Sequence, residues 1–278
     1  MSTPPVALTI AGSDSCGGAG VQADLKAFAA HQVFGTSALT ALTAQNTTGV
    51  TGVHAVPAAF VVLQVETVLA DLQVAAVKTG MLATASVVEA VAGLAAAGRL
   101  PRLVVDPVMV ASSGARLLEP DAERAYVDLL LPHAQVLTPN LLEAQVLLGA
   151  EIRTLAEQQE AARALGALGP RVVVVKGGHA VSDAGGEAVD VVWDGVTVTE
   201  LRSPRQPGGN DHGTGCTFAA TVAARLAHGD DVADALLAAK GYVARAIAGA
   251  VDWRLGAGHG PLDHFLWGAP ARAATPSP

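Results

Sequence analysis

A short glycine-rich segment in the last third of the chain carries the strongest chemical signal. It runs Asn210-Asp211-His212-Gly213-Thr214-Gly215-Cys216 and opens an alanine-rich stretch. Glycines let backbone N–H groups approach an anion, and a helix N-terminus favours negative charge, so the segment is typical of a phosphate or oxyanion cradle. The helix end also favours a thiolate at Cys216, which could accept a proton from a substrate hydroxyl. The alternative is a small buried cysteine in a tight strand-to-helix turn.

Other polar residues follow apolar runs elsewhere in the chain. Asn140 and Glu143 stand three residues apart on one predicted helical face, and Lys176 ends an apolar run. An amide and a carboxylate at this spacing can hold a hydrated Mg²⁺ and orient phosphate oxygens, because Mg²⁺ binds few carboxylates and keeps its waters. Lys176 can reach a nucleotide phosphate. The alternatives are a surface Glu143 with Asn140 as a helix cap, and a Lys176 that extends to solvent.

Hydrophobic periodicity predicts the elements that position these residues. Short β-branched runs alternate with alanine- and leucine-rich stretches without a linker, which predicts a single domain over residues 1–267, while residues 268–278 have little to bury and are predicted to be a mobile tail. The predicted strands are residues 6–10, 37–43, 53–56, 75–78, 103–105, 135–137, 172–176, 190–193 and 196–201. The predicted helices are residues 21–30, 58–70, 85–97, 121–131, 141–148, 155–168, 217–227 and 232–248.

The predicted fold class is α/β, a three-layer α/β/α sandwich with a mostly parallel central sheet. Runs such as residues 172–175 are apolar at successive positions, as expected where helices cover both faces of a sheet. Ligands of such sheets collect at the carboxyl ends of the strands. Polar residues follow one predicted strand after another, so we expect a shared site at that edge.

Composition and pattern exclude several classes of function. The formal charge of −8, from 17 basic and 25 acidic residues, provides no broad positive surface for nucleic acid or an anionic membrane. The chain lacks a Walker loop and a Gly-x-Gly-x-x-Gly fingerprint, which disfavours a P-loop protein and a nicotinamide dehydrogenase. Two cysteines and an N-terminus without a basic region predict a reducing, cytoplasmic location.

Taken in order, the motifs resemble the hydroxymethylpyrimidine/phosphomethylpyrimidine kinases of thiamine biosynthesis, in the ribokinase-like superfamily. They are GSD at residues 12–14, GGAGVQADLK at 17–26, TAQNT at 43–47, KTGM at 78–81, DPVM at 106–109, TPNxxE at 138–143, KGGH at 176–179, HGTGCT at 212–217 and GHGPLDH at 258–264. The resemblance implies ATP- and Mg²⁺-dependent phosphorylation of 4-amino-5-hydroxymethyl-2-methylpyrimidine, then of its monophosphate to the diphosphate. It also implies a homodimer.

The resemblance further implies a role for individual residues. Gln45 recognises the edge of the pyrimidine, since its amide oxygen can accept from the exocyclic amine and its amide nitrogen can donate to a ring nitrogen. The alternative is that Gln45 satisfies hydrogen-bonding groups of the buried backbone. The implied pocket residues are Gly12, Asp14, Ala19, Met81 and Val108, with core filling as the alternative for Met81. The implied ATP and Mg²⁺ residues are Asn140, Glu143, Lys176 and Asp106. The implied phosphoryl-transfer residues are Gly213, Thr214, Gly215 and Cys216, the last as base.

Three positions depart from the family pattern. Asp211 stands where threonine is usual, Ser112 where lysine is frequent, and Cys16 where glycine or serine is usual. The nearest alternative activity is a pyridoxal or pyridoxine kinase. An alternative of another class is a non-catalytic nucleotide- or vitamin-sensing module on the same fold.

Overall fold

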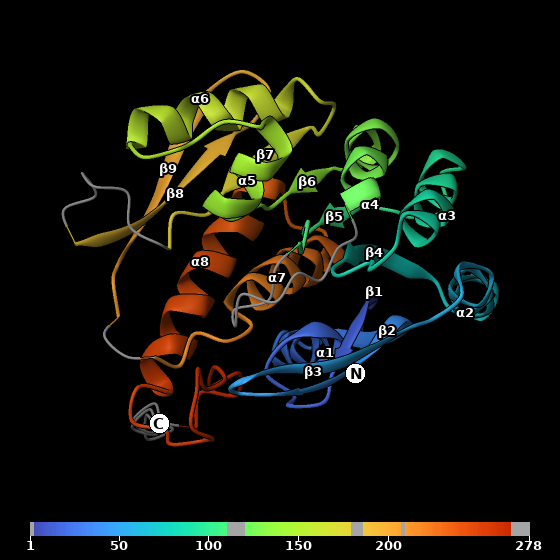
Figure 1. Ribbon diagram of the computed structural model, residues 1–278, viewed down its shortest axis with the longest axis horizontal. Coiled ribbons are helices and arrows are strands. Elements are labelled where there is room, and N and C mark those ends of the chain that lie inside the picture. The colour runs from blue at the N-terminus through green and yellow to red at the C-terminus, as the bar shows by residue number, and fades with distance from the viewer. Residues whose placement is uncertain (1–2, 110–119, 179–185, 207–208, 268–278) are drawn as a thin grey trace, which may run out of the picture.

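All nine strands of the described residues belong to one sheet (Figure 1). The structure, a computed structural model, describes residues 3–109, 120–178, 186–206 and 209–267. The strands are β1 (Val6–Asp14), β2 (Phe34–Asn46), β3 (Gly49–Ala55), β4 (Val74–Thr79), β5 (Val104–Val105), β6 (Val136–Leu137), β7 (Val172–Val175), β8 (Glu187–Trp193) and β9 (Val198–Pro204). Their order is β3-β2-β1-β4-β5-β6-β7-β8-β9, parallel from β2 to β7 and antiparallel at the edges. Every predicted strand is present.

Helices cover both faces of the sheet, so the predicted three-layer α/β/α sandwich is confirmed (Figure 1). One face carries α1 (Gly20–Ala30), α7 (Thr214–His228) and α8 (Val232–Gly249). The other carries α2 (Ala58–Asp71), α3 (Ala85–Ala96), α4 (Pro120–Ala125), α5 (Leu141–Leu148) and α6 (Leu155–Gly166). None of the helices in the described ranges combines the length and the apolar character that a membrane span requires.

Successive strand residues face the two helical layers in turn. Val104 packs against the core under α7 and α8, and Val105 packs against the core under α3 and α6. The same alternation holds for Val136 and Leu137. A side chain on a strand alternates between faces, so a strand buried on both faces must be apolar at every position. This is why the consecutive valines of the sequence form central strands.

Two predicted helices differ from the structure at their ends. The helix predicted over residues 121–131 ends as α4 at Ala125, followed by a π turn (Tyr126–Leu130) and a 3₁₀ turn (Leu131–His133). Pro132 has no N–H to donate, so the ladder of helical hydrogen bonds cannot continue through it. The helix predicted from residue 217 begins at Thr214 as α7, after Gly213 with φ +85°. Gly215 and Cys216 therefore lie in the first helical turn.

Two predictions fall outside the described residues: the mobile tail at 268–278 and the unusual Ser112.

Candidate active site

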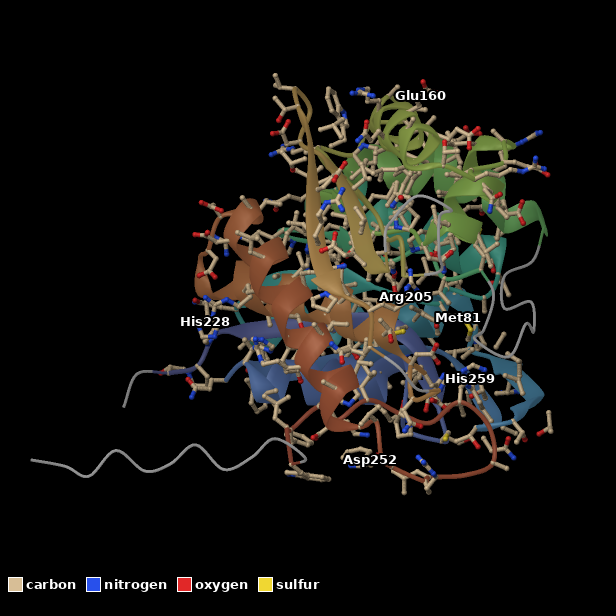
Figure 2. The ribbon with its side chains drawn as sticks, turned by 90° about the vertical axis from the view of Figure 1, so that its left-hand side faces the viewer. Met81, Glu160, Arg205, His228, Asp252 and His259 are labelled. Carbon is tan, nitrogen blue, oxygen red and sulfur yellow. The ribbon has the colours of Figure 1, made fainter. Side chains whose placement is uncertain are left out.

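The predicted site residues follow the carboxyl ends of the parallel strands or open α7. Gly12 and Asp14 end β1, Gln45 ends β2, Met81 follows β4, Asp106 and Val108 follow β5, Asn140 follows β6, and Lys176 follows β7. Because parallel strands end at one edge of a sheet, these residues share that edge. In Figure 2, Met81, Arg205 and His259 lie toward the right of the view. His228, which ends α7, lies on the left-hand side, far from them in this view.

Asp14 folds the turn that follows β1. Its side-chain oxygens accept hydrogen bonds from the backbone N–H groups of Cys16, Gly18 and Ala19, at 2.8, 3.1 and 2.8 Å. Burial raises the pKa of this carboxyl, but the hydrogen bonds from His212 and the backbone outweigh burial and hold the pKa below its ordinary value. The structure therefore places Asp14 and Ala19 at the site, with the carboxylate already engaged by the protein.

The turn after β1 touches the glycine-rich segment before α7. A Cβ atom on Gly213 would overlap the carbonyl oxygen of Gly18 and lie 3.2 Å from the Cα of Ala19. A Cβ on Gly18 would overlap the ring of His212. Gly213 must be glycine because it lies against the backbone of Gly18, and Gly18 makes room for the ring of His212.

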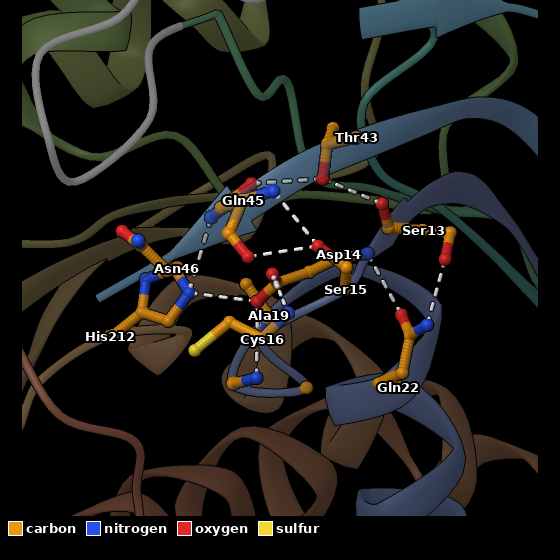
Figure 3. A network of polar contacts seen from close by, with 12 residues as sticks. Ser13, Asp14, Ser15, Cys16, Ala19, Gln22, Thr43, Gln45, Asn46 and His212 are labelled. Atoms are coloured by element: carbon orange, nitrogen blue, oxygen red, sulfur yellow. Dashed lines mark hydrogen bonds and ion pairs between the residues drawn. The ribbon is translucent and has the colours of Figure 1, made fainter. Parts of the chain in front are cut away.

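His212 links this contact to Gln45, as Figure 3 shows. Its Nε2 lies 2.9 Å from Asp14 Oδ2 and 3.4 Å from Gln45 Nε2. Both His212 and Asp14 are buried. His212 belongs to the HGTGCT motif, but its place in the sequence did not predict a role for it. The only available signal was the motif itself, because Asp14 and His212 are 198 residues apart in the chain.

An apolar wall stands beside Gly12. Ala41, Met81 and Ala83 form a small buried cluster against which Val108 packs. A Cβ on Gly12 would lie 2.5 Å from Met81 Cε, so the glycine makes room for the methionine side chain. The structure thus brings together the predicted pocket residues Gly12, Met81 and Val108.

Lys176 and Asp106 form an ion pair next to the first turn of α7. Lys176 Nζ lies 2.9 Å from Asp106 Oδ1, which also accepts a hydrogen bond of 3.2 Å from Thr138. A Cβ on Gly215 would lie 2.9 Å from Lys176 Nζ. Burial lowers the pKa of Lys176, but the negative charges of Asp106 and Glu143 outweigh burial and raise it above its ordinary value. Lys176 is therefore a largely buried cation, with its side chain 11% exposed, held by Asp106 and not a lysine that extends to solvent.

Asn140 and Glu143 form a capping box at the start of α5. Asn140 Oδ1 accepts the N–H of Glu143 at 2.9 Å, and Glu143 Oε2 accepts the N–H of Asn140 at 2.7 Å. The capping alternative is therefore present, but Glu143 is buried, not on the surface. Burial raises the pKa of Glu143 to about 7, with Lys176 acting against the rise and Asp106 adding to it.

The donor set around Asp106 and Glu143 suits Mg²⁺ carried in with a nucleotide. Two buried carboxylates lie close enough for the Asp106 charge to act on Glu143. No group of three or more His, Cys, Asp or Glu side chains within the described part of the chain could form a complete metal cage. Mg²⁺ is ordinarily held by one or two carboxylates, substrate phosphates and water. The residues present fit that mode of binding.

The glycine-rich cradle differs from the prediction at Thr214. The N–H of Thr214 donates to the carbonyl oxygen of Asp211 at 3.1 Å, and its hydroxyl donates to the same oxygen at 2.6 Å. The side chain of Asp211 lies 2.8 Å from His259 Nδ1. Residues in the first turn of a helix have no intrahelical acceptor for their N–H groups. The N–H of Gly215 is therefore better suited to an anion than the N–H of Thr214, which already has an acceptor.

The surroundings of Cys216 favour a neutral thiol, contrary to the expected thiolate. Burial raises its pKa to about 11, and the positive charge of Lys78 does not offset burial together with the charges of Asp24 and Asp106. The sequence placed Cys216 correctly at a helix start. It did not show the two acidic side chains that lie near the thiol. Cys16 and Cys216 are both free.

A fully buried ion pair accounts for much of the charge near Cys216. Lys78 Nζ lies 2.9 and 3.0 Å from the two carboxylate oxygens of Asp24, and Thr9 Oγ1 donates to Asp24 at 2.6 Å. Both charged side chains have 0% exposure. Lys78 belongs to the KTGM motif of the sequence, but the sequence did not predict its partner.

Known proteins with similar sequences belong to one family of kinases. The sequence model of the phosphomethylpyrimidine kinase family matches residues 14–263. The hydroxymethylpyrimidine/phosphomethylpyrimidine kinase of Synechococcus elongatus is 49% identical over 261 residues, covering 94% of this chain and 97% of that protein. The thiamine biosynthesis bifunctional protein ThiED of Geobacter sulfurreducens is 48% identical, and the chain spans about half (52%) of its length.

A solved structure with the same fold is the pyridoxal kinase of Staphylococcus aureus in complex with AMP-PCP and pyridoxal. It is 35% identical, with a TM-score of 0.86, and the match covers 96% of this chain and 95% of that one. The expected ribokinase-like fold is thereby confirmed. With a family match over most of its length and relatives close to 50% identical, the chain belongs to the phosphomethylpyrimidine kinase family.

Proposed function

We propose that the protein phosphorylates the hydroxymethyl group of 4-amino-5-hydroxymethyl-2-methylpyrimidine with ATP, and then converts the monophosphate to the diphosphate. One observation carries the proposal: the segment that opens α7 contacts both halves of the site. His212 lies beside Gln45, and Gly215 lies beside Lys176. A heterocycle held by Gln45 and a phosphate held by Lys176 would therefore meet at the start of α7.

Binding and positioning account for most of the work in phosphoryl transfer. The apolar wall of Met81 and Val108 would hold the ring, and the Gln45 amide would pair with the amine and a ring nitrogen. Backbone N–H groups at Gly213 and Gly215, with the Lys176 ammonium, would stabilise the oxygens of the phosphoryl group in transit. These contacts orient the hydroxymethyl oxygen toward ATP.

The metal and the nucleotide would share one corner of the site. Asp106 and Glu143 would hold the waters of Mg²⁺, and Asn140 and Lys176 would bind the ATP phosphates. Bound Mg²⁺ would supply neutralisation of the phosphate charge. Asn140 uses its amide oxygen for the cap of α5, so the amide nitrogen can donate to a phosphate.

Cys216 is proposed to take the hydroxymethyl proton. Its pKa of about 11 makes the thiolate a minor species at neutral pH. A neutral thiol cannot accept a proton, so only the minor thiolate form would act as the base, and the rate of the chemical step should rise with pH. Cys216→Ala is therefore expected to lower turnover with little change in the KM for the pyrimidine.

The similarity to a pyridoxal kinase structure keeps B6 phosphorylation as a second candidate function. Pyridoxal has no amine for the Gln45 carbonyl group. Gln45→Leu is therefore expected to cost the pyrimidine activity far more than any B6 activity, and equal losses would count against Gln45 as the selective residue.

The decisive experiment is product analysis by mass spectrometry. The purified chain is incubated with ATP, Mg²⁺ and one of three acceptors: the free pyrimidine, its monophosphate or pyridoxal. We expect the monophosphate and then the diphosphate from the free pyrimidine, and the diphosphate from the monophosphate. Binding without any phosphorylated product, unchanged in Cys216→Ala, would instead support the non-catalytic sensing module. The homodimer stays a prediction that rests on the resemblance, and the cytoplasmic location stays a prediction that rests on the low cysteine content.

A further inference from the structure

Gln45 lies between two polar groups from different parts of the chain. Its Nε2 is 3.4 Å from Nε2 of His212, and its Oε1 is 3.2 Å from Oγ1 of Thr43 (Figure 3). Rotation of the amide by 180° about the last bond of the side chain exchanges these two atoms. The donors and acceptors of the neighbours therefore decide which end of the amide each neighbour prefers.

On one side, His212 presents a donor. Asp14 Oδ2 accepts the backbone N–H groups of Gly18 and Ala19 and faces His212 Nε2 at 2.9 Å. A carboxylate has only lone pairs, so Nε2 of His212 must carry a proton at this distance. That proton is donated to Asp14, so Nε2 of His212 has no lone pair left for the Gln45 amide at 3.4 Å. An amide NH₂ therefore finds no acceptor there, whereas an amide oxygen is attracted by the partial positive charge of the N–H group.

On the other side, Thr43 presents a lone pair. Its hydroxyl lies 2.9 Å from the carbonyl oxygen of Ser13, which can only accept a hydrogen bond. Thr43 has one hydroxyl proton, and this shorter contact takes it. The lone pairs of Oγ1 therefore face Gln45, and the amide NH₂ is their matching partner.

Both neighbours thus favour the same rotated amide. We infer that His212 and Thr43 are positioning residues that hold Gln45 with Oε1 toward His212 and Nε2 toward Thr43. An aminopyrimidine then binds with its exocyclic amine on the His212 side and its ring nitrogen on the Thr43 side. The inference rests on the proposed function, and it adds the order of donor and acceptor that the site selects.

A double-mutant cycle tests whether His212 acts through Gln45. His212→Phe, Gln45→Leu and the double variant are compared for kcat and KM with the hydroxymethylpyrimidine. We expect His212→Phe to raise KM about tenfold, the equivalent of one lost hydrogen bond, with kcat nearly unchanged. In the Gln45→Leu background the same substitution should add less than about twofold. His212→Gln, which can restore a side-chain N–H donor, should return KM to within about threefold of the wild-type value.

Thr43→Val gives an independent test should His212→Phe not fold. It should raise the KM in wild type and not in the Gln45→Leu background. Thr36→Val is the matched control: Thr36 lies on the same strand and its hydroxyl donates 3.0 Å to the carbonyl of Ala7, away from the site. It should leave KM unchanged.

Additive losses in the two backgrounds, or an equal fall in kcat in both, would overturn the inference and leave His212 and Thr43 as parts of the scaffold. The proposed function fails in a different way, because wild type would then form no phosphorylated pyrimidine.

Discussion

At the level of single residues, Cys216 shows how neighbours change the chemistry of a side chain. A helix start lowers the pKa of a cysteine in general. Here burial and the charges of Asp24 and Asp106 dominate and raise the pKa to about 11. The thiolate fraction should therefore increase about tenfold per pH unit from pH 7 to pH 10.

The rate of alkylation of Cys216 by iodoacetamide measures this fraction. The experiment uses the Cys16→Ser variant, so that a single thiol reacts, and Cys16→Ser/Cys216→Ala provides the blank. We expect a rate that still climbs at pH 9.5. A plateau reached by pH 8 would mean that the helix end, not burial, controls the thiol.

At the level of elements, Asn140 at the start of α5 has a structural role and a proposed role in ligand binding. Its amide oxygen caps the helix, and its amide nitrogen is proposed to bind a phosphate. Serine is as good a cap as asparagine but has no NH₂ group. Asn140→Ser should keep the free energy of unfolding close to the wild-type value, whereas Asn140→Ala should lower it by about 1 kcal/mol.

Both variants should weaken binding of a non-hydrolysable ATP analogue by a similar factor, about five- to tenfold, since both lose the same donor. Urea titration and calorimetric binding separate the two roles. If Asn140→Ser binds the nucleotide as wild type does, the residue serves only as a cap.

The elements themselves were largely predictable. Consecutive valines and alanine-rich stretches produced the right strands and helices because burial on both sheet faces leaves a strong apolar pattern. The ends of α4 and α7 were not predictable. The positive φ of Gly213 and the change from α to π geometry after Ala125 are features of the backbone, which periodicity does not report.

At the level of the whole molecule, the C-terminal residues of the described chain close on the start of α7. Nε2 of the buried His264 lies 2.9 Å from Thr217 Oγ1, and the hydroxyl of Tyr242 donates to the His264 carbonyl oxygen at 2.6 Å. Burial lowers the pKa of His264 to about 4, from an ordinary value of 6.5, with the charge of Lys26 acting in the same direction. A depressed histidine pKa means that protonation favours the unfolded chain.

The stability that neutral His264 contributes is complete above pH 6.5 and is lost as the pH falls toward 4. Between pH 7.5 and pH 5 the loss amounts to about 2 kcal/mol. We expect His264→Asn to flatten the pH dependence of the free energy of unfolding by about this amount, as measured by urea titration. An unchanged slope would show that other groups set the acid sensitivity.

Side-chain types and their order along the chain were enough for the α/β architecture, for the edge of the sheet that carries the site and for the family. These follow from local periodicity and from the common direction of parallel strands, which brings their polar ends together. Only the folded chain could reveal that His212 touches both Asp14 and Gln45, that Lys78 is buried against Asp24, and that Cys216 holds its proton. Hydrogen bonds and pKa values depend on distance and burial in space, and residues nearly two hundred positions apart have no spacing signal that reports either.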